Sequence, residues 1–189
     1  MKIDLENLFE VREMTKEDES LLSSIDSRSV STEKILVTFD NKEFHYSFTE
    51  VASFTKKYDP RMLPIDNYFE QDKYHVLYAY LKDQIVGQII LYKSWNNYCY
   101  IDDIRVDEAH KGMGIGRALI EVSCDWAMEN NLKAIELETQ DVNASACKFY
   151  LREGFHIGAV DTHKYLLLDG DVNKEISIQF FKSLIVEDE

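Results

Sequence analysis

The chain has 189 residues, a length that suits one domain built around a single core. It carries 21 basic and 35 acidic residues, a formal net charge of −14, so nucleic acid is not expected as a partner. Acidity of this size favours a cationic small molecule, although it also serves solubility alone. Two prolines and seven glycines exclude a long low-complexity linker.

The cysteines Cys99, Cys124 and Cys147 are too few and too scattered for a disulfide framework or a zinc site. An odd number of cysteines fits a reducing compartment. Residues 1–13 lack the apolar segment of a secretory signal, and no apolar run reaches the length of a membrane-spanning helix. We therefore expect a cytoplasmic protein with no membrane partner and no bound metal.

The first third of the chain gives weak signals. Thr15 and Asp18 have the spacing of a capped helical turn. Residues 49–57 mix apolar and polar side chains as a short helix does, and Asp59-Pro60 would end that helix. The predicted elements are a strand at 8–14, the helical segment opened by Thr15, a strand at 34–39, a helix at 49–57 and a loop at 58–73.

The pattern sharpens after residue 74. Strand-like runs at 75–81 and 85–92 are separated by three polar residues, which predicts a hairpin, and a third strand is predicted at 98–106. A helix follows, because apolar residues then recur at i, i+3, i+4, i+7 and i+11, on one helical face. These residues are Ile115, Ala118, Leu119, Val122 and Trp126.

The last part of the chain adds a strand at 134–139, where apolar and acidic residues alternate. Asn143 can cap a short helix that runs through Glu153, with Gly154 just after its end. Runs at 155–160 and 164–168 are interpreted as a closing pair of strands. Strands followed by interspersed helices predict a mixed α/β fold, a sheet with helices packed on it.

A glycine-rich turn, Lys111-Gly112-Met113-Gly114-Ile115-Gly116, lies between the third strand and its helix. Glycine lets the backbone bend there and lets a ligand approach the main chain. The amides of residues 112–116 together with the helix dipole form an anion site suited to a pyrophosphate.

Four interpretations of this turn compete. A P-loop needs Gly-Lys-Ser/Thr, and Gly116-Arg117-Ala118 fails that requirement. A Rossmann fingerprint needs Gly-x-Gly-x-x-Gly after the first strand, whereas Gly-x-Gly-x-Gly stands here, late in the chain. The acyl-CoA loop, Arg/Gln-x-x-Gly-x-Gly/Ala, matches except at Lys111. A tight turn without a ligand is the fourth interpretation.

Three motifs follow one another between about Val76 and Leu168: Tyr100-Ile101-Asp102-Asp103-Ile104-Arg105-Val106, the glycine turn, and Asn143-x-x-Ala146-x-x-Phe149-Tyr150-x-x-x-Gly154-Phe155. In this order they resemble the GNAT acetyltransferase superfamily, which implies a mostly antiparallel twisted sheet with flanking helices. A closer resemblance to the streptothricin acetyltransferases comes from Trp95-Asn96-Asn97-Tyr98, Leu137-Glu138-Thr139-Gln140-Asp141 and Val160-Asp161-Thr162. Those enzymes acetylate the β-lysine moiety of streptothricin-type antibiotics.

The resemblance implies acetyl-CoA as co-substrate, held by the third strand, the glycine turn and the second helix. Lys111 departs from the Arg or Gln usual in the family, but it keeps a positive charge near phosphate, so we expect binding to survive. The implied cofactor-binding residues are Ile104, Arg105, Val106, Lys111, Gly112, Met113, Gly114, Ile115, Gly116, Arg117, Asn143, Ala146 and Tyr150.

Acetyl transfer to an amine needs a deprotonated amine, a polarised thioester oxygen and a proton or hydrogen bond for the leaving thiolate. The resemblance implies that Tyr150 is the general acid, facing the CoA sulfur, although Phe149-Tyr150 can also be read as core packing. No acyl-enzyme is required, so Cys147 is interpreted as helix packing.

The acids Asp102, Asp103, Glu136 and Glu138 lie on two central strands beside the glycine turn. In a regular strand Asp102 and Asp103 point to opposite faces, unless the strand bulges there, as GNAT strands commonly do. We expect Asp103 and Glu138 to bind an ammonium group and Asp102 to act as a base, through a water. The alternative is that these acids lie at a solvated sheet edge. A carboxylate with an ordinary pKa is a weak base for an amine, so a desolvated pocket can contribute more to deprotonation of the substrate than the carboxylate does.

Aromatic side chains favour cations, so Trp95, Tyr98 and Tyr165 are candidates for the wall of a substrate pocket. Each of them taken alone is more often core or hairpin packing. Asp161 is a further acidic candidate for substrate binding. His110 precedes the phosphate turn and is interpreted as a surface residue.

The sequence thus predicts an N-acetyltransferase that modifies a primary amine of a cationic antibiotic, the β-lysine moiety of streptothricin. One alternative is a polyamine or a protein amine as acceptor. Another is an acyl-CoA-binding module without catalysis, against which Tyr150 argues. Relatives often dimerise, which leaves a homodimer open.

Overall fold

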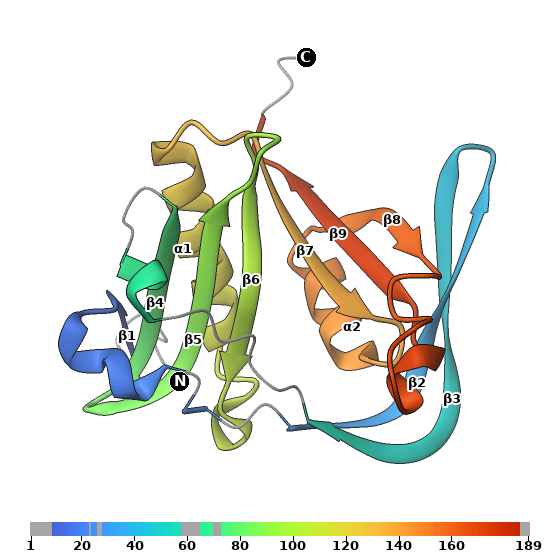
Figure 1. Cartoon of the computed structure of the whole chain (residues 1–189), viewed down its shortest axis with the longest axis horizontal. Coiled ribbons are helices and arrows are strands. Elements are labelled where there is room, and N and C mark those ends of the chain that lie inside the picture. The colour runs from blue at the N-terminus through green and yellow to red at the C-terminus, as the bar shows by residue number, and fades with distance from the viewer. Residues whose placement is uncertain (1–8, 23, 26–27, 58–64, 70–72, 186–189) are drawn as a thin grey trace, which may run out of the picture. The chain divides into compact units, whose positions relative to one another are not determined.

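The computed structural model describes residues 9–22, 24–25, 28–57, 65–69 and 73–185. Contacts within the chain divide it into two compact units. The first unit comprises Met1–Ser27, Tyr58–Ile135 and Leu184–Glu189, and the second comprises Arg28–Lys57 and Glu136–Ser183. Figure 1 colours these segments along the sequence.

The first unit is built on four strands in the order β1-β4-β5-β6, with every neighbouring pair antiparallel. The hairpin predicted between the second and third of them is confirmed, with Lys82 in the left-handed conformation of its tight turn. The strands are β1 (Glu10–Glu13), β4 (Tyr74–Leu81), β5 (Gln84–Lys93) and β6 (Cys99–Val106).

Helix α1 (Ile115–Glu129) packs against β4, β5 and β6 (Figure 1). Its predicted apolar face is confirmed for Ile115 and Leu119, which are buried, whereas Val122 and Trp126 are half-buried at the edge of that face. The helix face that is fully buried lies about one residue further along the chain than the predicted face. It consists of Ile115, Leu119, Ile120, Ser123 and Ala127.

A second apolar cluster joins the strands to the N-terminal segments. Thr15 and Asp18 form the predicted capping box, which opens the short 3-10 helix η2 (Lys16–Leu21). Another 3-10 helix, η3 (Ile65–Phe69), lies within the loop predicted at 58–73, of which residues 58–64 and 70–72 are outside the described part. The cluster contains Met14, Leu22, Tyr68, Val76, Tyr78 and Ile90.

The second unit holds strands in the order β7-β9-β8, with β8 and β9 antiparallel, together with helix α2 and a separate two-stranded sheet. Asn143 caps α2 as predicted, and Gly154 follows its end with a positive φ of 83°. The elements are β7 (Ala134–Gln140), α2 (Ala144–Arg152), β8 (His156–Asp161), η5 (Asp171–Lys174) and β9 (Ser177–Ser183).

The predicted helix at 49–57 is wrong. These residues belong to β3 (Glu43–Lys57), which pairs with β2 (Arg28–Asp40) in a long antiparallel ribbon (Figure 1). The cross-strand partners that decide this lie too far back in sequence for a local pattern to reveal them. Asn41 and Lys42 join the two strands, both with positive φ, as a two-residue hairpin turn requires.

The predicted strand at 164–168 is also wrong. The Asp161 carboxylate accepts hydrogen bonds from the backbone amides of His163 (2.8 Å) and Lys164 (3.1 Å), and this bends the chain into turns. The strand that pairs with β8 is β9 instead. With these two corrections, the expected mixed α/β fold, a mostly antiparallel sheet with flanking helices, is confirmed.

Candidate active site

The bulge expected in the acidic strand is present in β6. Ile90 of β5 pairs with Asp103, but the next residue, Leu91, pairs with Ile101, so the register skips Asp102. An extra residue of this kind bends a strand and redirects the side chains beside it. Asp102, the proposed base, therefore lies at the irregular point of β6.

Asp103 is held by two buried partners. Its carboxylate accepts a hydrogen bond from Gln88 Nε2 at 2.7 Å and pairs with Arg105 Nε at 2.8 Å. Gln88 is 0% exposed and Arg105 7% exposed. Arg105 lies two positions along β6 on the same face, and Gln88 stands opposite it on β5. The charge of Asp103 is thus balanced within the first unit.

The glycine turn has the backbone that its sequence predicts. Gly112 and Gly114 have positive φ values of 79° and 87°, and a Cβ on either would meet nothing within 4 Å. The backbone conformation, not crowding, therefore requires glycine there, and the space beside the turn is open. α1 begins directly after Gly114, whose carbonyl accepts from Ala118 N at 3.0 Å. The first amides of a helix have no acceptor within it and favour an anion.

The position of this turn depends on Gly87, which sequence reasoning missed. A Cβ added to Gly87 would stand 2.8 Å from Ile115 Cγ2, 3.2 Å from Leu119 Cδ1 and 3.1 Å from Ala79 Cβ. Glycine on β5 thus lets the first turn of α1 approach the strands closely. A glycine inside a strand pattern is the signal that could have identified it.

Charged side chains around the turn form exposed ion pairs. Lys111 pairs with Glu108, and Arg117 Nε lies 3.2 Å from Glu121 Oε1. Exposed pairs of this kind contribute little to stability. His110 Nδ1 lies 2.6 Å from Asp107 Oδ2, at the 3-10 helix η4 (Glu108–His110).

Just before α2, Asn143 Oδ1 accepts from the backbone amide of Ala146 at 3.4 Å. Tyr150 is 6% exposed, and its ring lies 5.8 Å from that of Phe155 and 5.5 Å from that of Phe180. The Tyr150 ring is therefore part of the core of the second unit, as the packing interpretation expected. Its role as an acid stays a prediction.

The cysteine residues Cys99 and Cys147 are buried, and burial raises the pKa of each thiol to about 12. A thiol with so high a pKa is protonated at neutral pH and is a weak nucleophile. Cys147 also packs inside α2, with Sγ 3.8 Å from the carbonyl oxygen of Gln140. The interpretation of Cys147 as a packing residue is confirmed.

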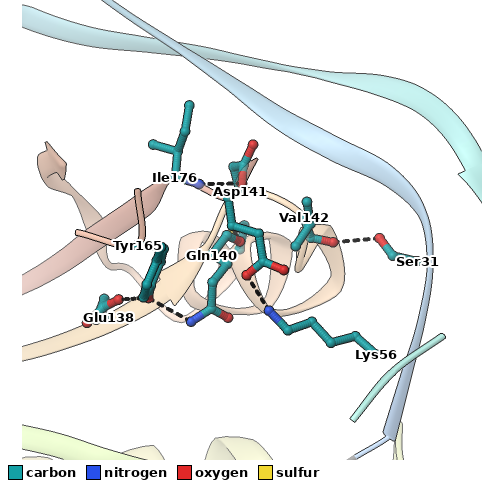
Figure 2. Close-up of polar contacts among 10 residues, drawn as sticks. Ser31, Lys56, Glu138, Gln140, Asp141, Val142, Tyr165 and Ile176 are labelled. Carbon is teal, nitrogen blue, oxygen red and sulfur yellow. Dashed lines mark hydrogen bonds and ion pairs between the residues drawn. The ribbon is translucent and has the colours of Figure 1, made fainter. Parts of the chain in front are cut away.

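Glu138 and Tyr165 meet in the second unit (Figure 2). The Tyr165 hydroxyl donates to Glu138 Oε1 and accepts from Gln140 Nε2 at 2.9 Å. Lys164 Nζ pairs with the other carboxylate oxygen of Glu138. Burial, reinforced by the hydrogen bond to Glu138, raises the pKa of Tyr165 well above its usual range, so its hydroxyl stays a donor at neutral pH.

The same end of β7 anchors the β2–β3 ribbon. Asp141 is 4% exposed; its backbone carbonyl accepts from Ile35 N, and its Oδ1 accepts from Ile176 N, both at 2.9 Å. Ser31 Oγ donates to the carbonyl of Val142 at 2.6 Å, and Lys56 pairs with Glu175 (Figure 2). Sequence reasoning missed the contacts of Ile35, Ser31 and Lys56, because each joins the ribbon to a residue more than 100 positions further along the chain.

The remaining candidates are Trp95, Tyr98 and Asp161. Trp95 is 96% exposed, in the connection between β5 and β6, and Tyr98 is half-buried. Asp161 caps the turn after β8. Within the first unit the structure therefore gathers Asp102, Asp103 and Arg105 on β6, which leads into the glycine turn. Within the second it brings Glu138 and Tyr165 together.

In the described ranges, no group of three or more His, Cys, Asp or Glu side chains is arranged to hold a metal ion. Nor does that part of the chain contain a helix of the length and apolarity that a bilayer crossing needs.

Comparisons with known proteins add to this geometry. Residues 39–155, more than half of the chain, match the Acetyltransferase (GNAT) family. Streptothricin acetyltransferase A of Bacillus subtilis is 35% identical over 70% of this chain and 76% of its own length. A streptothricin acetyltransferase of Escherichia coli is 38% identical over 46% of this chain and 50% of its own.

Among solved structures, a proposed streptothricin acetyltransferase from Bacillus anthracis, crystallised with acetyl coenzyme A, is 33% identical. The match covers 93% of this chain and 99% of that one, with a TM-score of 0.84. The likeness therefore extends over nearly the whole chain.

Proposed function

This chain belongs to the GNAT family of acetyltransferases, and from that premise we propose that it acetylates a primary amine of streptothricin, in the β-lysine moiety. It is an acetyl-CoA-dependent N-acetyltransferase by family, and the acceptor is the proposed part. The observation that carries the acceptor is the 35% identity to streptothricin acetyltransferase A of Bacillus subtilis over most of both chains.

The proposed reaction is direct. The amine of the acceptor loses a proton, and its lone pair attacks the thioester carbonyl of acetyl-CoA. The carbon–sulfur bond then breaks, and the CoA thiolate takes up a proton. We assign the donation of that proton to the Tyr150 hydroxyl and the acceptance of the amine proton to Asp102, through a water. Asp102 suits this role because it lies at the bulge of β6.

Acetyl-CoA is assigned to the glycine turn and the start of α1. The amides after Gly114 and the cations Lys111 and Arg117 would face the pyrophosphate, and Asn143 and Ala146 the pantetheine arm. The open space beside Gly112 and Gly114 supports this assignment. The acceptor's ammonium groups are assigned to Glu138 and Tyr165, with Asp103, Asp161 and Trp95 as further substrate-binding residues.

The acceptor is tested by the release of CoA from acetyl-CoA with streptothricin, spermidine and lysine-containing peptides offered in parallel. We expect streptothricin to give the highest kcat/KM, and cells that express the protein to grow in streptothricin. Turnover of spermidine or a peptide without turnover of streptothricin would replace the proposed acceptor.

The proton donor is tested by Tyr150→Phe. Because a positioned acid contributes about 100-fold or more, we expect kcat to fall by about 100-fold while the Kd for acetyl-CoA, measured by calorimetry, stays within about threefold. Tyr150→Leu, which also removes the ring from the core, serves as the comparison for packing. An unchanged kcat in Tyr150→Phe would remove the assignment.

A further inference from the structure

The ammonium-binding position at Glu138 is already taken by a group of this chain. We propose that Lys164 is a resident ammonium that occupies the acceptor's position on Glu138, and that a cationic acceptor binds by displacing it. This inference rests on the proposed function, because it takes the acceptor to be a cationic amine.

The carboxylate of Glu138 is fixed in one orientation. Its side chain is 11% exposed and lies on β7, and its Oε1 accepts from the Tyr165 hydroxyl. Gln140 in turn donates to Tyr165 at 2.9 Å, so the hydroxyl cannot turn away without losing a second bond. The other oxygen, Oε2, faces the Lys164 ammonium. A carboxylate with so little exposure needs a positive partner, and in this chain that partner is placed at Oε2.

Lys164 is held far less firmly than Glu138. Its side chain is 32% exposed, and its residue stands in the turns that follow β8, not in a strand. Its backbone amide bonds to Asp161 at 3.1 Å, so the main chain is fixed while the side chain can leave. The segment that follows packs little, since Leu166, Leu167 and Leu168 are 51%, 94% and 51% exposed.

Exchange of one ammonium for another keeps the charge of the site unchanged. When Lys164 leaves, its ammonium enters water, where solvation is favourable, and the acceptor's ammonium takes its place beside Oε2. A neutral molecule cannot do this, because it would leave Glu138 buried without a cation. Lys164 therefore lowers the affinity for every amine and selects for acceptors with a charged group to supply.

The experiment measures binding rather than turnover. The enzyme is saturated with CoA, which cannot donate an acetyl group, and titrated calorimetrically with streptothricin and separately with spermidine. We expect Lys164→Met to lower the Kd by about three- to tenfold, the range that removal of a competing, partly exposed ion pair allows. Lys164→Arg should raise the Kd, because a guanidinium holds a carboxylate through two hydrogen bonds.

Lys174→Met is the matched control. It removes the same charge from an ion pair with Asp171 that is largely exposed, at 76% and 94%. Its Kd should equal that of the wild type, which separates displacement from the general effect of net charge. If Lys164→Met does not fold, the Kd of Lys164→Arg tests the inference alone. An unchanged Kd in Lys164→Arg overturns the inference.

The two proposals fail in different ways. A Kd that Lys164→Met leaves unchanged or raises overturns the displacement, whatever the acceptor. Wild-type enzyme that binds neither cation overturns it as well. Binding with the expected pattern of Kd values, but without acetylation of streptothricin when acetyl-CoA is supplied, overturns only the proposed acceptor.

Discussion

Asp103 and Glu138 are both acids on central strands, and the sequence gives them the same predicted role, yet the two units treat them differently. Asp103 pairs with Arg105, whose side chain is 6% exposed, and with the buried amide of Gln88. Glu138 pairs with Lys164, whose side chain is 32% exposed. We expect a carboxylate bound by a buried guanidinium to keep that partner when a substrate binds beside it, whereas one bound by a partly exposed lysine can exchange its partner. Asp103 and Glu138 therefore differ in the exposure of the cation that each one pairs with.

Loss of Arg105 should have the largest effect, because Arg105 balances the charge of Asp103. Arg105→Met would leave the Asp103 charge without its buried partner, and we expect a loss of about 3 kcal/mol in the free energy of unfolding, measured in urea. Because it removes the charge that is left over, Asp103→Asn in the same chain should recover part of that loss. A loss of unfolding free energy below about 1 kcal/mol would show that Asp103, like Glu138, can do without its cationic partner.

Gly87 tests whether the first unit is as closely built as its buried ion pair indicates. Gly87→Ala places a methyl group 2.8 Å from Ile115 Cγ2, so we expect a loss of about 2 kcal/mol in urea unfolding and weaker acetyl-CoA binding. Gly158→Ala is the control, because its Cβ would come no nearer than 3.4 Å to Phe181 Cβ. Equal losses in the two variants would contradict the close approach of α1.

Glu138→Gln addresses the other side of the comparison. If Glu138 binds the acceptor's ammonium, KM for the acceptor should rise by about tenfold, with KM for acetyl-CoA unchanged. Stability should change by less than about 1 kcal/mol, because Lys164 can turn to water. Steady-state kinetics with each substrate varied in turn measure both constants. A rise in both KM values would indicate a disturbed fold instead.

The smallest expected effect belongs to Ser177, at the start of β9. Its hydroxyl is buried, and among the described residues it has no hydrogen-bond partner. Since a buried hydroxyl without a partner stabilises nothing, Ser177→Ala should leave the unfolding free energy unchanged or raise it by up to about 1 kcal/mol. Thermal unfolding measures this. A clear loss would show that the second unit depends on a bond at this hydroxyl.

Sequence patterns predicted the region from β4 to α2 well, because strand alternation, one helical face and two caps are local signals. They failed for β3 and β9, whose partners β2 and β8 decide the structure. The bulge at Asp102 followed from the family resemblance. Arg105 could be paired with Asp103 from the spacing of two, but Lys164 reaches Glu138 across 26 residues, through a turn that the patterns interpreted as a strand.

The high pKa values of the thiols of Cys99 and Cys147 have a practical consequence. Released CoA can be titrated continuously with a disulfide dye, which reacts with thiolates. Both of these cysteines are buried and protonated, so the protein itself consumes little reagent, and the half-buried Cys124 remains as the main internal background. The acceptor screen can therefore be run by a simple colour change.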